Sequence, residues 1–204
     1  AVRAIASFVR SIVSFDSAYD RYLAGDPSAM NESAVRGMTL FFSEKTECFH
    51  CHGGFNFTDS STHTSSRIES VGFHNNGLYN IGDNGGYPPS NTGLHDMTGK
   101  RRDMGRFKAP TLRNISLTAP YMHDGSIESL DAVLDHYQRG GRQIREGPYS
   151  GDGSRNPYKS VFVRAFELEE TERADLLAFL DALTDRSVLT NPRFSNPFTP
   201  SSTQ

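Results

Sequence analysis

Residues 48–52 read Cys48-Phe49-His50-Cys51-His52, and this short stretch is the strongest chemical signal in the chain. Two thiols three positions apart can each form a thioether with the same porphyrin, and a histidine directly after the second cysteine can bind its iron. The stretch therefore predicts one covalently bound c-type haem, attached through Cys48 and Cys51, with His52 as an axial ligand.

A Cys-x-x-Cys pair also occurs in redox-active dithiols and as one half of a zinc site. A thioredoxin-like dithiol should follow a strand in a strand–helix–strand unit, and the residues around Cys48 do not suggest one. A zinc site would need a second pair of ligands at suitable spacing. His50 lies inside the motif, but we expect it to be a solvated loop residue and not a ligand.

The composition limits what kind of protein this can be. The chain has 204 residues, enough for one domain, and the two cysteines of the motif are its only ones, so it has no disulfide framework. Its net charge of −3 combines interspersed charges of both signs, which argues against a nucleic-acid surface. No apolar run approaches the ~20 residues that a membrane-spanning helix needs. The first residues show no signal peptide and no N-cap, so we expect Ala1 to be a processing boundary.

Helical spacing of apolar residues recurs in four segments of the chain. The first three are residues 2–13, 33–43 and 127–140. We expect residues 2–13 to bury one face, and residues 33–43 lead into the motif. The fourth is a last helix that follows an N-cap at Thr171 and carries Leu176, Leu177, Leu180 and Leu183. Residues 16–31, with Asp26-Pro27 and Gly25, predict a loop between the first two helices.

Residues 53–108 have no such periodicity and are rich in Gly, Asn, Ser and Asp. A stretch of this length without regular structure is unusual in a compact domain unless something else orders it, and a large buried cofactor would do so. The sequence thus predicts a mainly α, class I cytochrome c-like haem domain with long ordered loops over residues 1–190, followed by an extended tail over residues 191–204.

The ligand on the opposite side of the iron is not decided by spacing. Met122, in a tight segment before a helix, would give a haem of raised potential suited to electron transfer. Tyr137 shares a helix face with Leu130 and Leu134 and so should point into the core, although a buried tyrosine is more often a packing residue. The other candidates are His123, His136 and the loop residues His63, His74, His95, Met97 and Met104.

A longer stretch of the sequence helps to choose between Met122 and Tyr137 as the second ligand. Residues 105–126 contain the strings PTLRN at 110–114 and APYMHDG at 119–125, and FHN stands upstream at 73–75. Together with Asp96-x-x-Gly99 and the last helix, this pattern resembles the C-terminal haem domain of bacterial di-haem cytochrome c peroxidases and MauG-type enzymes. The resemblance covers nearly the whole chain.

The resemblance implies particular ligands. In that family the distal ligand of this haem lies in the helix after the HDG turn, where peroxidases with soluble electron donors have methionine and MauG-type proteins have tyrosine. The matching position is Tyr137, which the resemblance therefore favours over Met122; a phenolate stabilises oxidised iron relative to a thioether. The resemblance also implies a calcium ion held by the backbone carbonyls of Thr118 and Pro120, together with an Asn of the other haem domain.

The chain departs from the family in having a single Cys-x-x-Cys-His motif and no Trp. Relatives carry a second motif in an N-terminal domain, which is where peroxide binds. The expected function is therefore that of the relay haem domain in a periplasmic di-haem peroxidase, exported by a signal peptide outside this sequence. Its expected partners are the second haem domain and a protein whose side chain is oxidised, or a small redox donor protein. The alternatives are a donor-driven cytochrome c peroxidase and a mono-haem electron carrier ligated by Met122.

Overall fold

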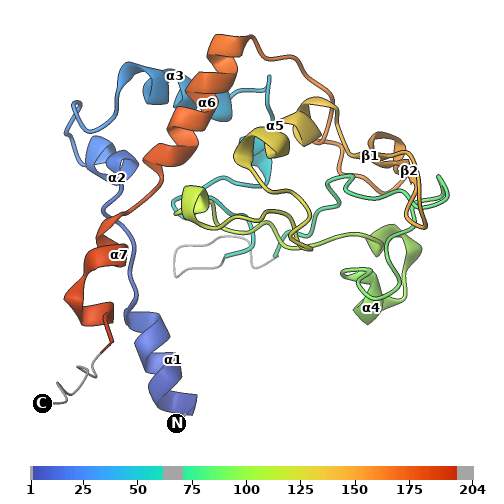
Figure 1. Cartoon of the computed structure of the whole chain (residues 1–204), viewed down its shortest axis with the longest axis horizontal. Helices are drawn as coiled ribbons and strands as arrows, with labels where there is room; N and C mark the ends of the chain where they lie inside the picture. The colour runs from blue at the N-terminus through green and yellow to red at the C-terminus, as the bar shows by residue number, and fades with distance from the viewer. Residues whose placement is uncertain (1, 62–70, 197–204) are drawn as a thin grey trace, which may run out of the picture.

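The computed structural model describes residues 2–61 and 71–196, and its regular structure is mainly helical (Figure 1). The helices are α1 (Val2–Ser11), α2 (Ala18–Leu23), α3 (Glu32–Phe41), α4 (His95–Thr98), α5 (Leu130–Gln138), α6 (Glu170–Ala182) and α7 (Ser187–Thr190). Two short strands, β1 (Gln143–Ile144) and β2 (Gly151–Asp152), pair antiparallel with Gln143 opposite Asp152. Among the described residues, no helix combines the length and the apolarity needed to cross a membrane.

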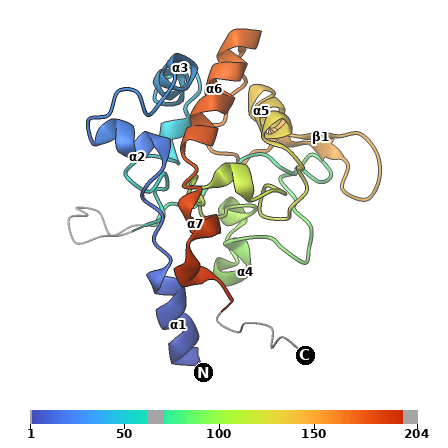
Figure 2. The same cartoon turned by 60° about the vertical axis from the view of Figure 1, so that its left-hand side comes forward.

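The main hydrophobic core forms where α3 packs against α6 (Figures 1 and 2). Phe41 and Phe179, one from each helix, are buried with their ring centroids 5.2 Å apart. Gly37 permits this close approach, because a Cβ at that position would lie 1.9 Å from the carbonyl oxygen of Asp175. The Arg36 guanidinium binds the Asp175 carboxylate across the same contact, with Nε 2.7 Å from Oδ2.

The loops of residues 71–129 pack around a second cluster of buried side chains, which consists of Leu78, Tyr79, Tyr87, Tyr121 and Ile127. Buried asparagine amides provide the hydrogen bonds that regular secondary structure would otherwise supply. Asn75 donates to the Met104 carbonyl and accepts from Gly77 N, while Asn156 donates to the Tyr79 carbonyl. The prediction of long ordered loops is confirmed for the described part of this region.

The predicted helices are present, with shifted ends. The helix expected from residue 127 begins at Leu130, because the Ser129 hydroxyl accepts from Ala132 N and caps it there. The N-cap predicted at Thr171 was wrong: the cap is Glu169, which exchanges hydrogen bonds with Glu172 in a capping box.

The loop predicted over residues 16–31 was wrong in its first half. This segment contains α2, whose N-cap Ser17 forms a capping box with Asp20. The Ser17 hydroxyl accepts from Asp20 N, and the Asp20 carboxylate accepts from Ser17 N at 3.0 Å. These bonds stabilise a short helix in spite of the Gly and Pro that follow it.

The helix predicted at residues 2–13 is present as α1, but the prediction that it buries one face was wrong. Ile5 is 62% exposed and Val9 58% exposed, and no residue of α1 is buried. Helix α1 projects from the rest of the chain (Figures 1 and 2), where Phe8 contacts Phe194 with ring centroids 6.3 Å apart. Phe194 belongs to a 3₁₀ turn at Pro192–Phe194. Residues 197–204 lie outside the described residues, so the extended tail over 191–204 stays a prediction.

Candidate functional site

A cavity of about 570 Å³ lies between the α3–α6 core, helix α5 and the loop over residues 107–123. This volume is in the range of cofactor pockets in proteins. All three predicted attachment and ligand residues of the motif line it. The remaining wall is largely apolar and includes Phe41, Leu112, Ile115, Leu130, Val133, Leu134, Val163, Leu176 and Leu180.

His52 has two different ring nitrogens. Its Nδ1 lies 3.1 Å from the Phe57 carbonyl oxygen and 3.1 Å from the Pro110 carbonyl oxygen. A nitrogen that faces carbonyl oxygens must carry the hydrogen, so Nε2 keeps the lone pair. Burial lowers the pKa of the ring, which keeps it neutral. Metal-binding histidines commonly donate their other N–H to a backbone carbonyl in this way, so the residue fits the role of an iron ligand.

Cys48 and Cys51 are held in the cavity wall by the 3₁₀ turn at Cys48–His50, which follows Glu47 in a left-handed conformation with φ 57°. Burial raises the pKa of the Cys48 thiol to about 11, and burial together with Asp59 raises that of Cys51 to about 12. Redox-active dithiols instead need a lowered thiol pKa. These surroundings argue against a thioredoxin-like dithiol.

The structure reduces the number of candidates for the ligand opposite His52. Tyr137, Met122, His123 and His74 line the cavity. Burial raises the pKa of the Tyr137 phenol to about 12. His74 Nε2 is bound to the Asp59 carboxylate.

Four other candidates do not line the cavity, and His63 lies outside the described residues. His136 is buried, and its Nε2 lies 3.0 Å from the Asn76 carbonyl oxygen. His95 Nδ1 lies 3.0 Å from the Lys100 carbonyl oxygen. Met97 is 87% exposed, and Met104 packs in the second cluster.

Asn76 is a cavity residue that the sequence analysis missed. Its side-chain nitrogen donates to Met122 Sδ at 3.3 Å. The Asn76 side chain also offsets part of the rise in the pKa of the Tyr137 phenol that burial causes. The one signal in the sequence was the Asn76-Gly77 pair, which indicates a turn and says nothing of a cavity.

Thr118 and Pro120, the predicted calcium ligands, are exposed residues at the edge of the cavity. Thr118 ends the 3₁₀ turn at Ile115–Leu117, and the Ala119–Pro120 peptide bond is cis. The two residues thus lie on one turn of the chain, directly before Tyr121.

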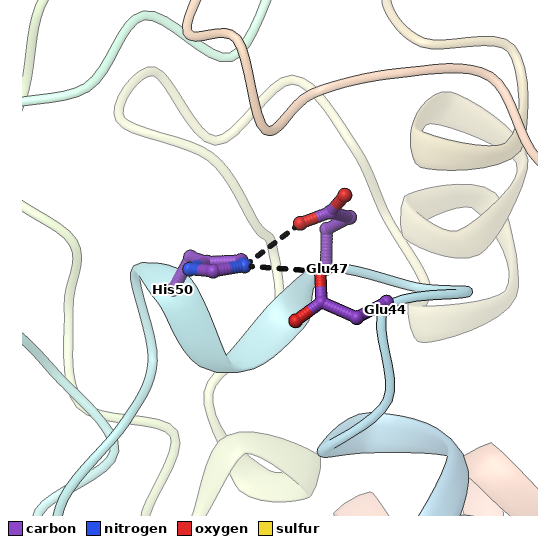
Figure 3. A group of neighbouring side chains, drawn as sticks. All are labelled: Glu44, Glu47 and His50. Atoms are coloured by element: carbon purple, nitrogen blue, oxygen red, sulfur yellow. Dashed lines mark ion pairs between the residues drawn. The ribbon is translucent and has the colours of Figure 1, made fainter.

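His50 is not the solvated residue that we expected. Its Nε2 lies 2.8 Å from Glu47 Oε2 and 3.6 Å from Glu44 Oε2 (Figure 3). Its ring stacks on Phe162 with centroids 4.0 Å apart. The expectation failed because an aromatic partner and two carboxylates, all outside the motif or at its edge, cover the ring. His50 is not among the residues that line the cavity.

Comparison with known proteins places these observations in a family. No protein-family model matches the chain. The chain is 37% identical over 183 residues to the methylamine utilization protein MauG of Methylorubrum extorquens, an alignment that covers 88% of this chain and 42% of that protein. It is 35% identical over 198 residues to the cytochrome-c peroxidase IdrP1 of a Pseudomonas species, covering 90% of this chain and 49% of that protein.

A solved structure agrees with the sequence matches. The crystal structure of a MauG-like protein associated with microbial copper homeostasis superposes with a TM-score of 0.89 at 50% identity, over 95% of this chain and 59% of that one. The chain spans about half the length of the curated relatives it matches. On this evidence the chain belongs to the family of MauG and the di-haem cytochrome c peroxidases.

Proposed function

We propose that this chain is a class I cytochrome c-like domain, over residues 1–190, that binds one haem c in its cavity. The thiols of Cys48 and Cys51 would each hold the haem through a thioether, formed by addition of S–H across the C=C of one vinyl group with nothing released. The observation that carries the proposal is His52: Nδ1 is fixed by two carbonyl oxygens in the wall that also holds both thiols.

Tyr137 is our proposed second axial ligand. Helix α5 carries it into the cavity that His52 lines, and the resemblance to MauG-type proteins matches it to their ligand tyrosine. A haem bound there supplies a one-electron redox centre. With His52 and Tyr137 on its two sides, the domain would leave no coordination position open to peroxide. A phenolate ligand would also favour the oxidised state of the iron.

The proposed role of the domain is to store and pass on oxidising equivalents within a MauG-type di-haem peroxidase of the periplasm. A second haem domain would hold the peroxide site, and the final reductant would be a side chain of a partner protein. The half-length match to di-haem relatives supports this division of labour. A calcium ion bound by the carbonyls of Thr118 and Pro120 would lie at the contact with the second domain.

A donor-driven electron-transfer haem is the second candidate, either within a cytochrome c peroxidase or as a mono-haem carrier. It is favoured by one observation: Met122 lines the same cavity as His52. The similarity to the cytochrome-c peroxidase IdrP1 is consistent with this candidate too.

The axial ligand separates the two candidates experimentally. We expect the haem-loaded ferric chain to lack the far-red absorption band of methionine ligation. Tyr137→Phe should change the ferric spectrum to that of a site with water or with an open position. The matched variant Met122→Leu should leave the spectrum nearly unchanged. Loss of six-coordination in Met122→Leu, with no effect of Tyr137→Phe, would establish the donor-driven candidate instead.

A further inference from the structure

Asn76 lies in the wall of the cavity that both candidate ligands, Met122 and Tyr137, also line. Its side-chain nitrogen donates to the sulfur of Met122 at 3.3 Å, and Tyr137 lines the same cavity. These two residues come from different elements, the turn before α5 and α5 itself. One amide group therefore binds one alternative and shares the cavity wall with the other.

The orientation of this amide is fixed by the backbone. Asn76 Oδ1 accepts a hydrogen bond from Leu78 N at 3.2 Å, so the NH₂ end must face the cavity. An amide nitrogen has two hydrogens, enough for the sulfur and the phenolic oxygen at once.

A second contact fixes the position of Asn76 relative to α5. The buried His136 lies with Nε2 3.0 Å from the Asn76 carbonyl oxygen, and a nitrogen in that position must donate. His136 directly precedes Tyr137 in the helix. A buried hydrogen bond thus ties the backbone of Asn76 to the helix that carries Tyr137.

We propose that Asn76 is a positioning residue that selects Tyr137 over Met122 as the ligand opposite His52. One N–H engages the Met122 sulfur, which makes its lone pair less available to a metal. The Tyr137 oxygen, which lines the same cavity, would then keep its lone pairs for the iron. This inference rests on the proposed function, since it requires haem in the cavity.

The test compares Asn76→Ala with Asn80→Ala in the haem-loaded chain. Asn80 is a matched control: it is a buried amide in the same loop region that bonds the Asp152 carbonyl and Gly85 N, and it does not line the cavity. We expect Asn76→Ala to acquire the far-red band of methionine ligation and a higher reduction potential, and Asn80→Ala to keep the parent spectrum. Adding Met122→Leu to Asn76→Ala should remove the new band.

Two further variants keep the test decisive if Asn76→Ala does not take up haem. Asn76→Asp retains the acceptor for Leu78 N without an N–H, so it should show the same new band. Asn76→Gln retains the N–H donor, so its spectrum should be closer to that of the parent protein than the spectrum of Asn76→Ala is.

The outcomes separate this inference from the proposed function. If the parent protein is tyrosine-ligated and both Asn76→Ala and Asn76→Asp keep its spectrum and potential, the inference is wrong and the function stands. Equal spectral changes in Asn76→Ala and Asn80→Ala would show a general structural effect and would also overturn the inference. A parent protein that already shows the far-red band would overturn the tyrosine-ligated function itself.

Discussion

The residues of the Cys-x-x-Cys-His motif have two different proposed roles, attachment of the haem and ligation of its iron. Cys48 and Cys51 have thiols that burial keeps protonated, whereas His52 is neutral with its Nδ1 committed to two carbonyl oxygens. The surroundings of His52 thus suit its proposed role as a ligand, and both thiols line the cavity in which attachment is proposed. These roles follow from spacing in the sequence, and the hydrogen bonds of His52 show how the fold supports them.

The first prediction at this scale concerns attachment. Cys48→Ala combined with Cys51→Ala should leave haem that acid–acetone removes completely, because no thioether can form. Each single variant should keep one thioether. His50→Ala is the matched control: it alters the motif outside the cavity and should keep haem covalently bound. Haem that resists extraction in the double variant would contradict the central proposal.

The site also shows what sequence could not predict at the scale of a residue. Helical spacing correctly placed Tyr137 toward the cavity, and the Cys-x-x-Cys-His spacing brought the motif residues to the same wall. Asn76 was missed because a polar residue before Gly77 indicates only a turn. His50 was misjudged because its partner Phe162 is more than a hundred positions away in the chain.

At the scale of elements, periodicity predicted the helices better than it predicted their ends. Helix α6 begins at Glu170 because Glu169 and Glu172 cap each other, although glutamate is not among the favoured N-cap residues. Helix α2 was missed because its six residues show too little periodicity, and the signal lay in the Ser17–Asp20 capping box. The loops could not be predicted, since buried Asn75 and Asn156 amides order them through long-range contacts that leave no periodic pattern.

The contact between α5 and the Asn76 loop should make stability depend on pH. Burial lowers the pKa of His136 from 6.5 to about 4, because the protonated ring would be desolvated. Below pH 6.5 the unfolded chain gains a proton that the folded chain does not. The contribution of the neutral His136 ring to the free energy of unfolding is therefore fully present above pH 6.5. It is lost as the pH drops toward 4, which lowers the free energy of unfolding by up to about 3 kcal/mol.

His136→Gln tests this expectation. Gln can still donate to the Asn76 carbonyl but does not titrate, so the free energy of unfolding should fall less between pH 7 and pH 4. Urea denaturation of the haem-loaded parent and variant at several pH values measures the difference. Parallel curves for the two proteins would show that His136 does not carry the pH dependence.

At the scale of the whole molecule, the chain combines a cavity lined by Cys48, Cys51 and His52 with about half the length of its relatives. If His52 and Tyr137 both bind the iron as proposed, the peroxide chemistry would belong to another part of a longer enzyme. This division predicts how the chain behaves when it is studied alone.

The haem-loaded chain should react slowly with hydrogen peroxide. Its ferric spectrum should persist when peroxide is added in stopped-flow mixing, because no coordination position is free. Tyr137→Phe should react faster, since it opens the distal position. Rapid spectral change in the parent chain would instead indicate a self-sufficient peroxidase.

Helix α1 presents Val2, Ile5 and Val9 to solvent. Water around such surface carries a large heat capacity, which is lost when the surface is covered. Whatever protein covers α1 would therefore bind with a negative heat-capacity change, and its binding enthalpy would become more favourable as the temperature rises. Titration calorimetry at several temperatures would thus register contact with α1 and would separate it from binding through a polar surface elsewhere.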